Sequence, residues 1–225
     1  MTVPLDPPLD LPPELDVPTP VGTARAVVEG EPGRGRLLLG HGAGGGVEAP
    51  DLLAARDAAL RLGLQVVRVV QPWRVAGRRV AEAPVRLDAA WTAVVAALPA
   101  APGPLLLGGR SAGARVACRT ATALGADGVL ALAFPFRPPG RPDRDRAAEL
   151  LLPDAPRLVV QGERDAFDVP PASPGVRVHV VAGADHAFAV RRRDGRTAVD
   201  LREELEQVVA AWLAERLGPA GQTVT

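Results

Sequence analysis

The chain has 225 residues, of which 47% are hydrophobic, and its 26 basic residues balance its 26 acidic ones. This length is typical of one globular domain, and the balanced charge gives no basic field for binding nucleic acid. All of the basic residues are arginine, which excludes a Schiff-base lysine and a lysine-containing phosphate loop. Cys118 is the single cysteine, so an intrachain disulfide is excluded and a reducing compartment is favoured.

The amino-terminal residues show no positively charged region followed by an apolar stretch, since the first basic residue is Arg25. We therefore expect no secretory signal and a cytoplasmic location. The longest uncharged run, residues 89–109, is interrupted by Pro99, Pro102 and Pro104. It predicts a helix, a turn and a strand rather than a membrane span, and we expect no membrane partner.

Prolines dominate residues 2–20, and this composition predicts an extended arm or an edge strand. We place a proline-rich arm at 1–15, a single domain at 16–217 and a tail at 218–225. Within the domain, strand patterns alternate with helix patterns. Strands are expected at residues 23–29, 36–40, 65–70, 104–108, 128–133, 157–161 and 176–181. Helices are expected at residues 50–62, 85–98, 112–124, 143–151 and 198–217.

This alternation favours an α/β fold with a mostly parallel central sheet and helices on both faces. Apolar runs such as QVVRVV and RLVVQ suit strands that are buried on both faces. The strands at 23–29 and 36–40 are joined by a short turn rich in glycine and proline, and they could pair as a hairpin. The segment between residues 133 and 157 is too short for a cap domain, so we expect no substantial lid.

The strongest local signal is the G-x-S-x-G motif formed by Gly109, Arg110, Ser111, Ala112 and Gly113, which lies between a predicted strand and a predicted helix. In this context the serine sits on a sharp, strained turn that exposes its hydroxyl, and small neighbours permit the turn. The motif therefore predicts that Ser111 is a nucleophile. The alternative is a helix start whose small residues serve packing alone.

A serine nucleophile needs a base, and the sequence contains only His41, His179 and His186. His186 is the best placed, because it follows the last predicted strand in a loop before the closing helix. His179 lies inside that strand and is interpreted as structural. His41 directly follows the strand at 36–40 and precedes glycines, which favours a role in shaping the loop.

A carboxylate should orient the imidazole of that base and stabilise its protonated form. Asp165 follows the strand at 157–161 and gives the chain order serine, acid, histidine. Glu163 and Asp168 on the same loop compete for this role, as does Asp185, which is adjacent to the predicted base.

The remaining requirement is a pair of donors for the oxyanion, which are usually backbone N–H groups. We assign them to Ala43, in the glycine-rich loop after the strand at 36–40, and to Ala112, the residue after the nucleophile. Glycines are expected to shape the loop and the turn around the serine, and these glycines are Gly42, Gly44, Gly109 and Gly113.

The run at residues 40–45 also satisfies G-x-G-x-x-G, the dinucleotide-binding fingerprint. A carboxylate for the ribose is missing at the end of the next strand, although Arg74 there could accept a 2′-phosphate. Histidine and cysteine show none of the usual metal-ligand spacings, so we expect no metal and no cofactor. Cys118 is interpreted as a buried small hydrophobe, and residues 191–193, three arginines, as a solvated turn or an anion-binding site.

Five motifs occur in the order LLLGHGAGGG, GGRSAGARVA, FPFRPPGRP, LVVQGERDAF and GADHAF. With these, residues 16–217 resemble the α/β-hydrolase family that includes a testis-expressed protein and a subunit of the nonspecific-lethal histone acetyltransferase complex, and more distantly the dienelactone hydrolases. The resemblance implies an α/β-hydrolase fold with Ser111 as nucleophile, Asp165 as acid and His186 as base. Animal members of that family occur as scaffolds in complexes.

These observations predict a serine hydrolase that acts on an ester or thioester of a small molecule through an acyl-enzyme. The first alternative is a catalytically silent binding or scaffold protein on the same fold, because function does not follow from fold. The second is a nucleotide-dependent enzyme, from the fingerprint at residues 40–45. The sequence does not reveal whether the protein is a monomer or an oligomer.

Overall fold

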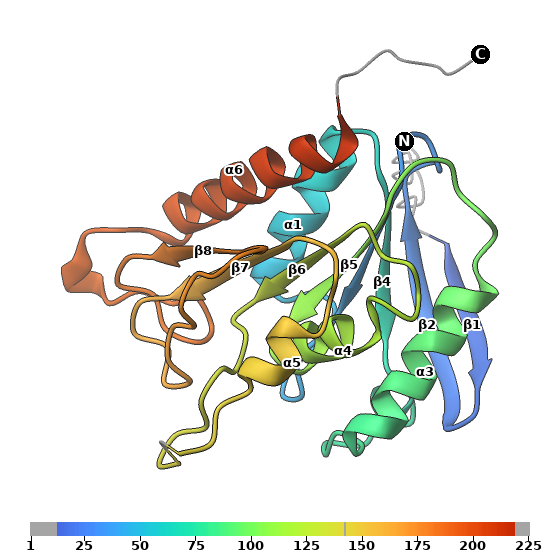
Figure 1. Cartoon of the computed structure of the whole chain (residues 1–225), viewed down its shortest axis with the longest axis horizontal. Coiled ribbons are helices and arrows are strands. Elements are labelled where there is room, and N and C mark those ends of the chain that lie inside the picture. Colours follow the sequence, from blue (N-terminus) through green and yellow to red (C-terminus); the bar gives the residue numbers. More distant parts are fainter. Residues whose placement is uncertain (1–12, 142, 219–225) are drawn as a thin grey trace, which may run out of the picture.

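The computed structural model describes residues 13–141 and 143–218. Its strands are β1 (Glu14–Thr19), β2 (Gly22–Glu29), β3 (Arg36–Gly40), β4 (Gln65–Val70), β5 (Leu105–Arg110), β6 (Gly128–Leu132), β7 (Arg157–Gly162) and β8 (Val176–Val181). They form one sheet in the order β1-β2-β4-β3-β5-β6-β7-β8 (Figure 1). The pairs β1–β2 and β2–β4 are antiparallel, and all other pairs are parallel. The predicted α/β class and the mostly parallel sheet are confirmed.

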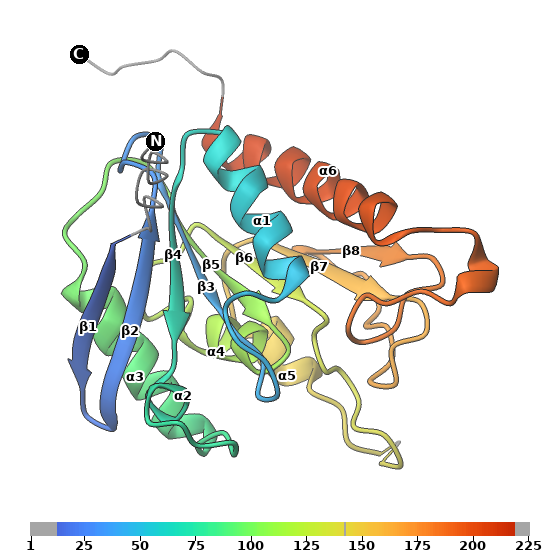
Figure 2. The same ribbon diagram turned by 180° about the vertical axis from the view of Figure 1, so that it is seen from behind.

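Helices cover both faces of this sheet, as predicted. They are α1 (Pro50–Arg61), α2 (Pro72–Val75), α3 (Pro84–Ala97), α4 (Ala112–Thr120), α5 (Ala147–Leu151) and α6 (Ala198–Leu217), with a 3₁₀ turn η1 (Arg192–Asp194) before α6. Proline in the first turn starts α1, α2 and α3, where its missing N–H costs no hydrogen bond. Figure 2 shows α1 beside α6 on one face, and α3, α4 and α5 pack on the other.

The central strand β3 shows how the two layers share the sheet. Leu37 and Leu39 pack in the cluster that includes α1 and α6, whereas Leu38 packs in the cluster that includes α3 and α4. All five residues of β3 are buried. A strand covered on both faces is mostly apolar, which explains the run Leu37–Leu39. The buried Arg36 at the start of β3 donates hydrogen bonds to the Gln65 side chain and the Pro99 carbonyl.

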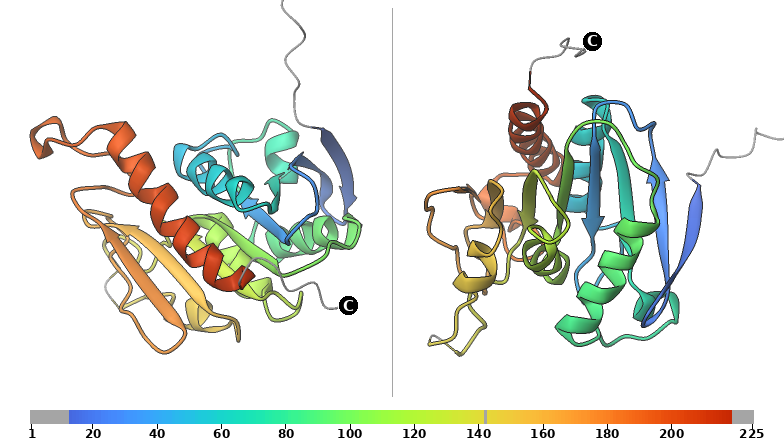
Figure 3. Two further views of the ribbon diagram at one scale, coloured as in Figure 1. Left: turned by 90° about the horizontal axis from the view of Figure 1, so that it is seen from above. Right: turned by 45° about the vertical axis from the view of Figure 1, so that its right-hand side comes forward.

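The predicted hairpin of residues 23–29 and 36–40 is wrong. β2 pairs with β1 and β4, while β3 lies between β4 and β5 in the middle of the sheet. The apolar run Leu37–Leu39 of β3 is stable only where helices cover both faces, whereas β2 tolerates a position near the sheet margin because five of its eight residues are not buried. Figure 3 shows β1 and β8 at opposite margins of the sheet.

Two helix boundaries also differ from the prediction. α4 ends at Thr120, and residues 121–125 form turns, because the Thr120 hydroxyl bonds back to Val116 and Gly125 adopts a positive φ. The helix predicted at 143–151 is reduced to α5, and α2 was not predicted. No cap domain is present in the described part of residues 133–156, which contains α5 alone.

The proline-rich start gives the predicted edge strand at β1, while residues 1–12 lie outside the described residues, as does most of the predicted tail. Over the ranges 13–141 and 143–218, no helix has the length and apolar character needed to cross a membrane.

Candidate active site

Ser111 lies directly after β5, at what we term the carboxyl end of the sheet, where β3 to β8 end. Its backbone has φ 51° and ψ −107°, a strained conformation for a residue with a side chain. The flanking glycines allow it, because a Cβ on Gly109 or Gly113 would overlap the backbone of Gly40 in β3. The turn at 109–113, here called the elbow, is therefore wedged against the central strand, which holds the serine at the end of the sheet.

The structure brings the three predicted triad residues together. His186 Nε2 lies 3.2 Å from Ser111 Oγ, and His186 Nδ1 lies 2.8 Å from Asp165 Oδ2. With the proton on Nδ1, the imidazole donates to the carboxylate and accepts from the serine hydroxyl. The Asp165 side chain is fully buried and is fixed by hydrogen bonds from Gln161 Nε2 at 2.7 Å and from the Phe167 backbone N–H at 2.8 Å.

His186 is held from two further directions. The Phe167 ring packs against its imidazole with centroids 4.7 Å apart. Arg110 Nη2 donates a hydrogen bond to the His186 backbone carbonyl at 2.9 Å. These contacts restrain both the ring and the loop at residues 182–191 that carries it, here called the histidine loop.

The three competing acids are engaged elsewhere. Glu163 accepts a hydrogen bond from a backbone N–H of the histidine loop. Asp168 forms an ion pair with Arg137 at 2.9 Å, and Asp185 accepts from two N–H groups of its own loop. Within the described residues, Asp165 is thus the carboxylate that contacts the imidazole of His186.

The glycine loop, residues 41–46, borders the serine. A Cβ on Gly42 would lie 3.5 Å from Ser111 Cβ, while Gly44 is exposed, with no atom within 4 Å of the position of a Cβ. The N–H groups of Ala43 and Ala112 make no hydrogen bond among the residues that the structure describes, and Ala112 is the first residue of α4. Unpaired N–H groups beside a nucleophile can bind a developing oxyanion.

His41 is the first residue of this loop and is buried. Its Nδ1 lies 2.8 Å from the Gly42 carbonyl oxygen and its Nε2 accepts from the Gln71 N–H at 3.2 Å. Burial lowers the pKa of His41, so the imidazole is neutral and bridges the ends of β3 and β4. These contacts agree with the loop-shaping interpretation of this histidine.

The other residues singled out from the sequence have no part in the hydrogen bonds of the triad. His179 on β8 bonds Glu204 of α6 at 2.7 Å. Cys118 is buried in α4, and this burial raises the pKa of its thiol to about 12. The arginines at 191–193 are exposed at η1. The glycine run at 40–45 does not open a helix, since α1 begins only at Pro50, and this differs from the dinucleotide fingerprint.

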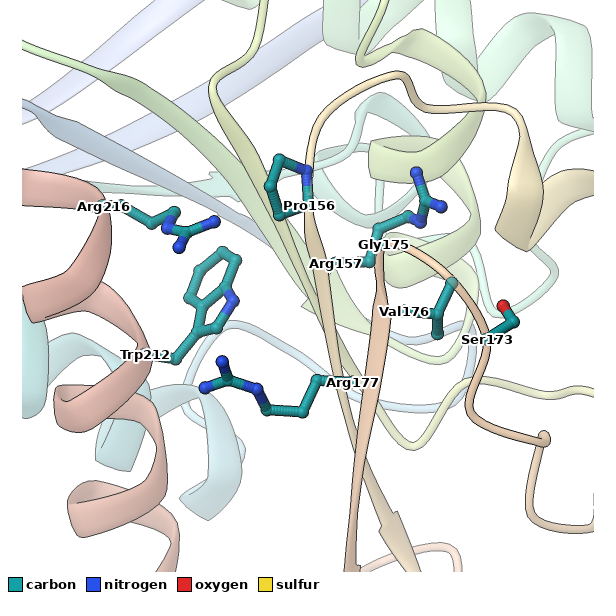
Figure 4. Close-up of a pocket in the computed structure, with 8 residues that line it drawn as sticks. All are labelled: Pro156, Arg157, Ser173, Gly175, Val176, Arg177, Trp212 and Arg216. Atoms are coloured by element: carbon teal, nitrogen blue, oxygen red, sulfur yellow. The ribbon is translucent and has the colours of Figure 1, made fainter.

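Cavity size does not locate the serine. Figure 4 shows a cavity of about 330 Å³ at the amino end of the sheet, where β7 and β8 begin, lined by Trp212, Arg157, Arg177 and Arg216 among others. A second cavity of about 350 Å³ lies beside the histidine loop, between the first turns of α1 and α6.

Three residues that contact the triad were not predicted from the sequence. Gln161, Phe167 and Arg110 each contact a triad member, yet the first two look like ordinary strand and loop residues. Arg110 occupies a variable position of the motif, and its charge beside a predicted nucleophile was the one available signal.

Comparison with known proteins identifies the fold independently of this geometry. The profile of a family described as alpha/beta hydrolase domain matches residues 33–214. The chain belongs to this alpha/beta hydrolase family. No curated protein matches the sequence.

Solved structures of other proteins superpose on this one over nearly their whole length. A lidless serine hydrolase from Xanthomonas campestris has a TM-score of 0.70 and 24% identity, with coverage of 93% of this chain and 98% of that one. A serine hydrolase homologue from Coxiella burnetii has a TM-score of 0.68 and 20% identity, with coverage of 92% and 99%. Est1E from Butyrivibrio proteoclasticus with bound ferulic acid has a TM-score of 0.68 and 13% identity, with coverage of 90% and 99%. At these identities the likeness concerns the fold.

Proposed function

We propose that this α/β hydrolase is a serine hydrolase that cleaves an ester or thioester of a small molecule. The observation that carries the proposal is the continuous hydrogen-bonded line from Ser111 Oγ through the His186 imidazole to the buried Asp165 carboxylate. A hydroxyl becomes nucleophilic when a positioned base accepts its proton as the new bond forms. The resemblance to the testis-expressed and nonspecific-lethal-complex family implies the same nucleophile, acid and base, whereas dienelactone hydrolases commonly use cysteine as the nucleophile.

In the proposed acylation, Ser111 Oγ attacks the carbonyl carbon while its proton passes to His186 Nε2. The imidazolium is stabilised by Asp165, whose buried carboxylate is not exposed to competing solvent. Negative charge develops on the carbonyl oxygen, where the N–H groups of Ala43 and Ala112 would donate to it. His186 then returns the proton to the departing alkoxide or thiolate, which leaves an ester on Ser111.

In deacylation, water takes the place of the leaving group. His186 accepts a proton from the water as it attacks the acyl carbon, and then gives that proton back to Ser111 Oγ, which restores the starting state. Every proton and electron pair is accounted for by these residues, the substrate and water, so the proposed reaction requires no cofactor.

Hydrolysis of p-nitrophenyl acetate, p-nitrophenyl butyrate and a short acyl thioester tests this proposal. The chain has two serines, Ser111 and Ser173, and Ser173 lies at the cavity at the opposite end of the sheet, so it offers a matched control. We expect Ser111→Ala to lose at least about a thousandfold in kcat. Ser173→Ala should retain activity within about twofold, because surface changes away from a site have small effects. Absence of turnover by the folded wild type would favour the binding or scaffold protein.

A further inference from the structure

Arg110 connects the elbow to the other parts of the site. Its Nη2 donates to the His186 backbone carbonyl at 2.9 Å. Its Nη1 lies 3.4 Å from the place that a Cβ on Gly42 would occupy, and its Nε lies 3.2 Å from Asp51 Oδ2. One guanidinium thus touches the histidine loop, the glycine loop and the first turn of α1, while the next residue in the chain is Ser111.

Asp51 is an unusual partner for this arginine, because its side chain is only 2% exposed. Neither Asp51 Oδ2 nor Arg110 Nε has a well-directed hydrogen-bond partner in the described residues, so the contact is one of charge. Burial raises the pKa of Asp51 to about 6, although the Arg110 charge opposes this. A buried carboxylate with incomplete hydrogen bonding destabilises a fold, and such groups concentrate at functional sites.

We propose that Arg110 and Asp51 are positioning residues for the reaction proposed above. Arg110 ties the histidine loop to the elbow, and Asp51 fixes the guanidinium in the orientation that makes this contact. The inference rests on the proposed function, because its catalytic consequence requires a working Ser111.

The physical reason is the sensitivity of the serine–imidazole contact to the backbone of the histidine loop. This loop contains Phe188 at φ 54°, a conformation that a residue with a side chain adopts only under restraint. A displacement of about 1 Å at a reacting group can cost about a hundredfold in rate. Arg110 acts on His186 through the backbone carbonyl, so it sets the position of the imidazole and does not take part in proton transfer.

The arrangement also predicts a pH dependence. Two charged groups near Asp51 lower its pKa against the effect of burial. They are Arg110, which belongs to the elbow, and to a smaller extent His186. The cavity of about 350 Å³ that Asp51 borders is also lined by Arg192, Arg196 and Arg202. The carboxylate is anionic above about pH 6 and holds Arg110, whereas below that pH it is neutral and its hold on Arg110 weakens.

The test compares Arg110→Met and Asp51→Asn with Arg115→Met as a matched control. Arg115 is another half-buried arginine near the elbow, but its bidentate ion pair is with Glu149 and not with the histidine loop. Arg110→Met should lower kcat about 10- to 100-fold and change KM less than about threefold, since it misplaces the base and not the substrate. Arg115→Met should leave both constants within about twofold.

Hydrogen–deuterium exchange of the peptide spanning residues 183–190 separates this inference from the proposed function, because it needs no turnover. We expect exchange at least about fivefold faster in Arg110→Met and unchanged exchange in Arg115→Met, since a loop that loses a restraint opens more often. Faster exchange with no turnover in the wild type would reject the hydrolase proposal and retain the restraint. Unchanged exchange in Arg110→Met would overturn the inference.

Asp51→Asn keeps the inference testable if Arg110→Met does not fold. The ratio of kcat between the wild type and Asp51→Asn should be close to one near pH 5 and rise to several-fold by pH 8, following ionisation of Asp51 in the wild type. A merely structural role for Asp51 predicts a constant ratio across this range, and that result would contradict the proposal.

Discussion

The two ends of the sheet differ in which residues adopt a positive φ. Among the described residues other than glycine, positive φ occurs at Ser111, Ala133, Asp168 and Phe188, all in turns at the carboxyl end. At the amino end, the turns before β3, β5 and β8 place glycines at positive φ, namely Gly35, Gly103 and Gly175. Glycine adopts this conformation without strain, whereas each other residue in it destabilises the folded state by about 1–3 kcal/mol. The fold tolerates strain at one end, where the candidate site lies.

The polar side chains at the two ends of the sheet also differ in the partners that they bind. Around the cavity at the amino end, Arg177 and Arg216 share Glu215, and Arg157 donates to backbone carbonyls of the segment that precedes β7. The Arg177–Glu215 ion pair joins β8 to α6, and the other contacts are local. At the carboxyl end, the hydrogen bonds that run from Asp165 through His186 end on Ser111, a partly exposed residue. The comparison locates the chemistry better than the size of the cavities does.

The largest expected effect is that of Asp165→Asn at the carboxyl end. The amide cannot hold the imidazole in the required tautomer or stabilise its charge, so kcat should fall by about four orders of magnitude with little change in the free energy of unfolding. Asp168→Asn serves as the control, because its ion pair with Arg137 lies outside the triad. Full activity in Asp165→Asn with loss in Asp168→Asn would reassign the acid.

A pair of glycine substitutions tests the contrast between the ends. A Cβ on Gly103, at the amino end, would overlap the Arg34 carbonyl, and a Cβ on Gly113 would overlap that of Gly40. Both alanine variants should lose about 2–4 kcal/mol in the free energy of unfolding. Only Gly113→Ala should also lower kcat, by at least about tenfold, because it separates the elbow from β3. Equal kcat in the two folded variants would contradict the contrast.

Asp51→Asn should stabilise the protein at neutral pH. The folded chain holds the Asp51 proton up to about pH 6 against an ordinary value of 3.8, so the wild type loses stability as pH rises between these values. Two pKa units correspond to about 3 kcal/mol. The variant does not titrate, and urea unfolding should show its advantage growing from pH 4 to pH 7.5, up to that size. A difference independent of pH would contradict the burial of a charged Asp51.

The smallest effect concerns Cys118. Its thiol remains protonated at pH 8, because burial raises its pKa to about 12. Iodoacetamide should therefore leave the native chain unmodified during a treatment that alkylates the urea-denatured chain completely, as read by intact mass. Rapid alkylation of the native chain would place the thiol at an accessible surface.

Local patterns explain which features were predictable from the sequence. The elbow lies between a strand and a helix that are only a few residues apart, so its glycines and Ser111 identify it without tertiary information. The alternation of strands and helices likewise predicted the mostly parallel sheet. The pairing of β2 with β4 was not predictable in this way, because a short connection favours a hairpin unless the burial of β3 on both faces is weighed against it.

The contacts that position the triad depend on distant parts of the chain. Asp51 lies in the first turn of α1, where an acidic residue is usually a solvated partner of the helix dipole. Only the assembled sheet buries it against Arg110. The hydrogen bond from Gln161 to Asp165 was equally hard to predict. It forms only because the loop after β7 folds back onto its own strand.

Treatment with a fluorophosphonate, followed by intact-mass measurement and peptide mapping, tests the central claim most directly, because this reagent modifies serines that are activated. We predict one adduct on the wild type, located on Ser111, with none on Ser173 and none on the Ser111→Ala variant. A folded wild-type protein that acquires no adduct would contradict the claim that His186 and Asp165 activate Ser111.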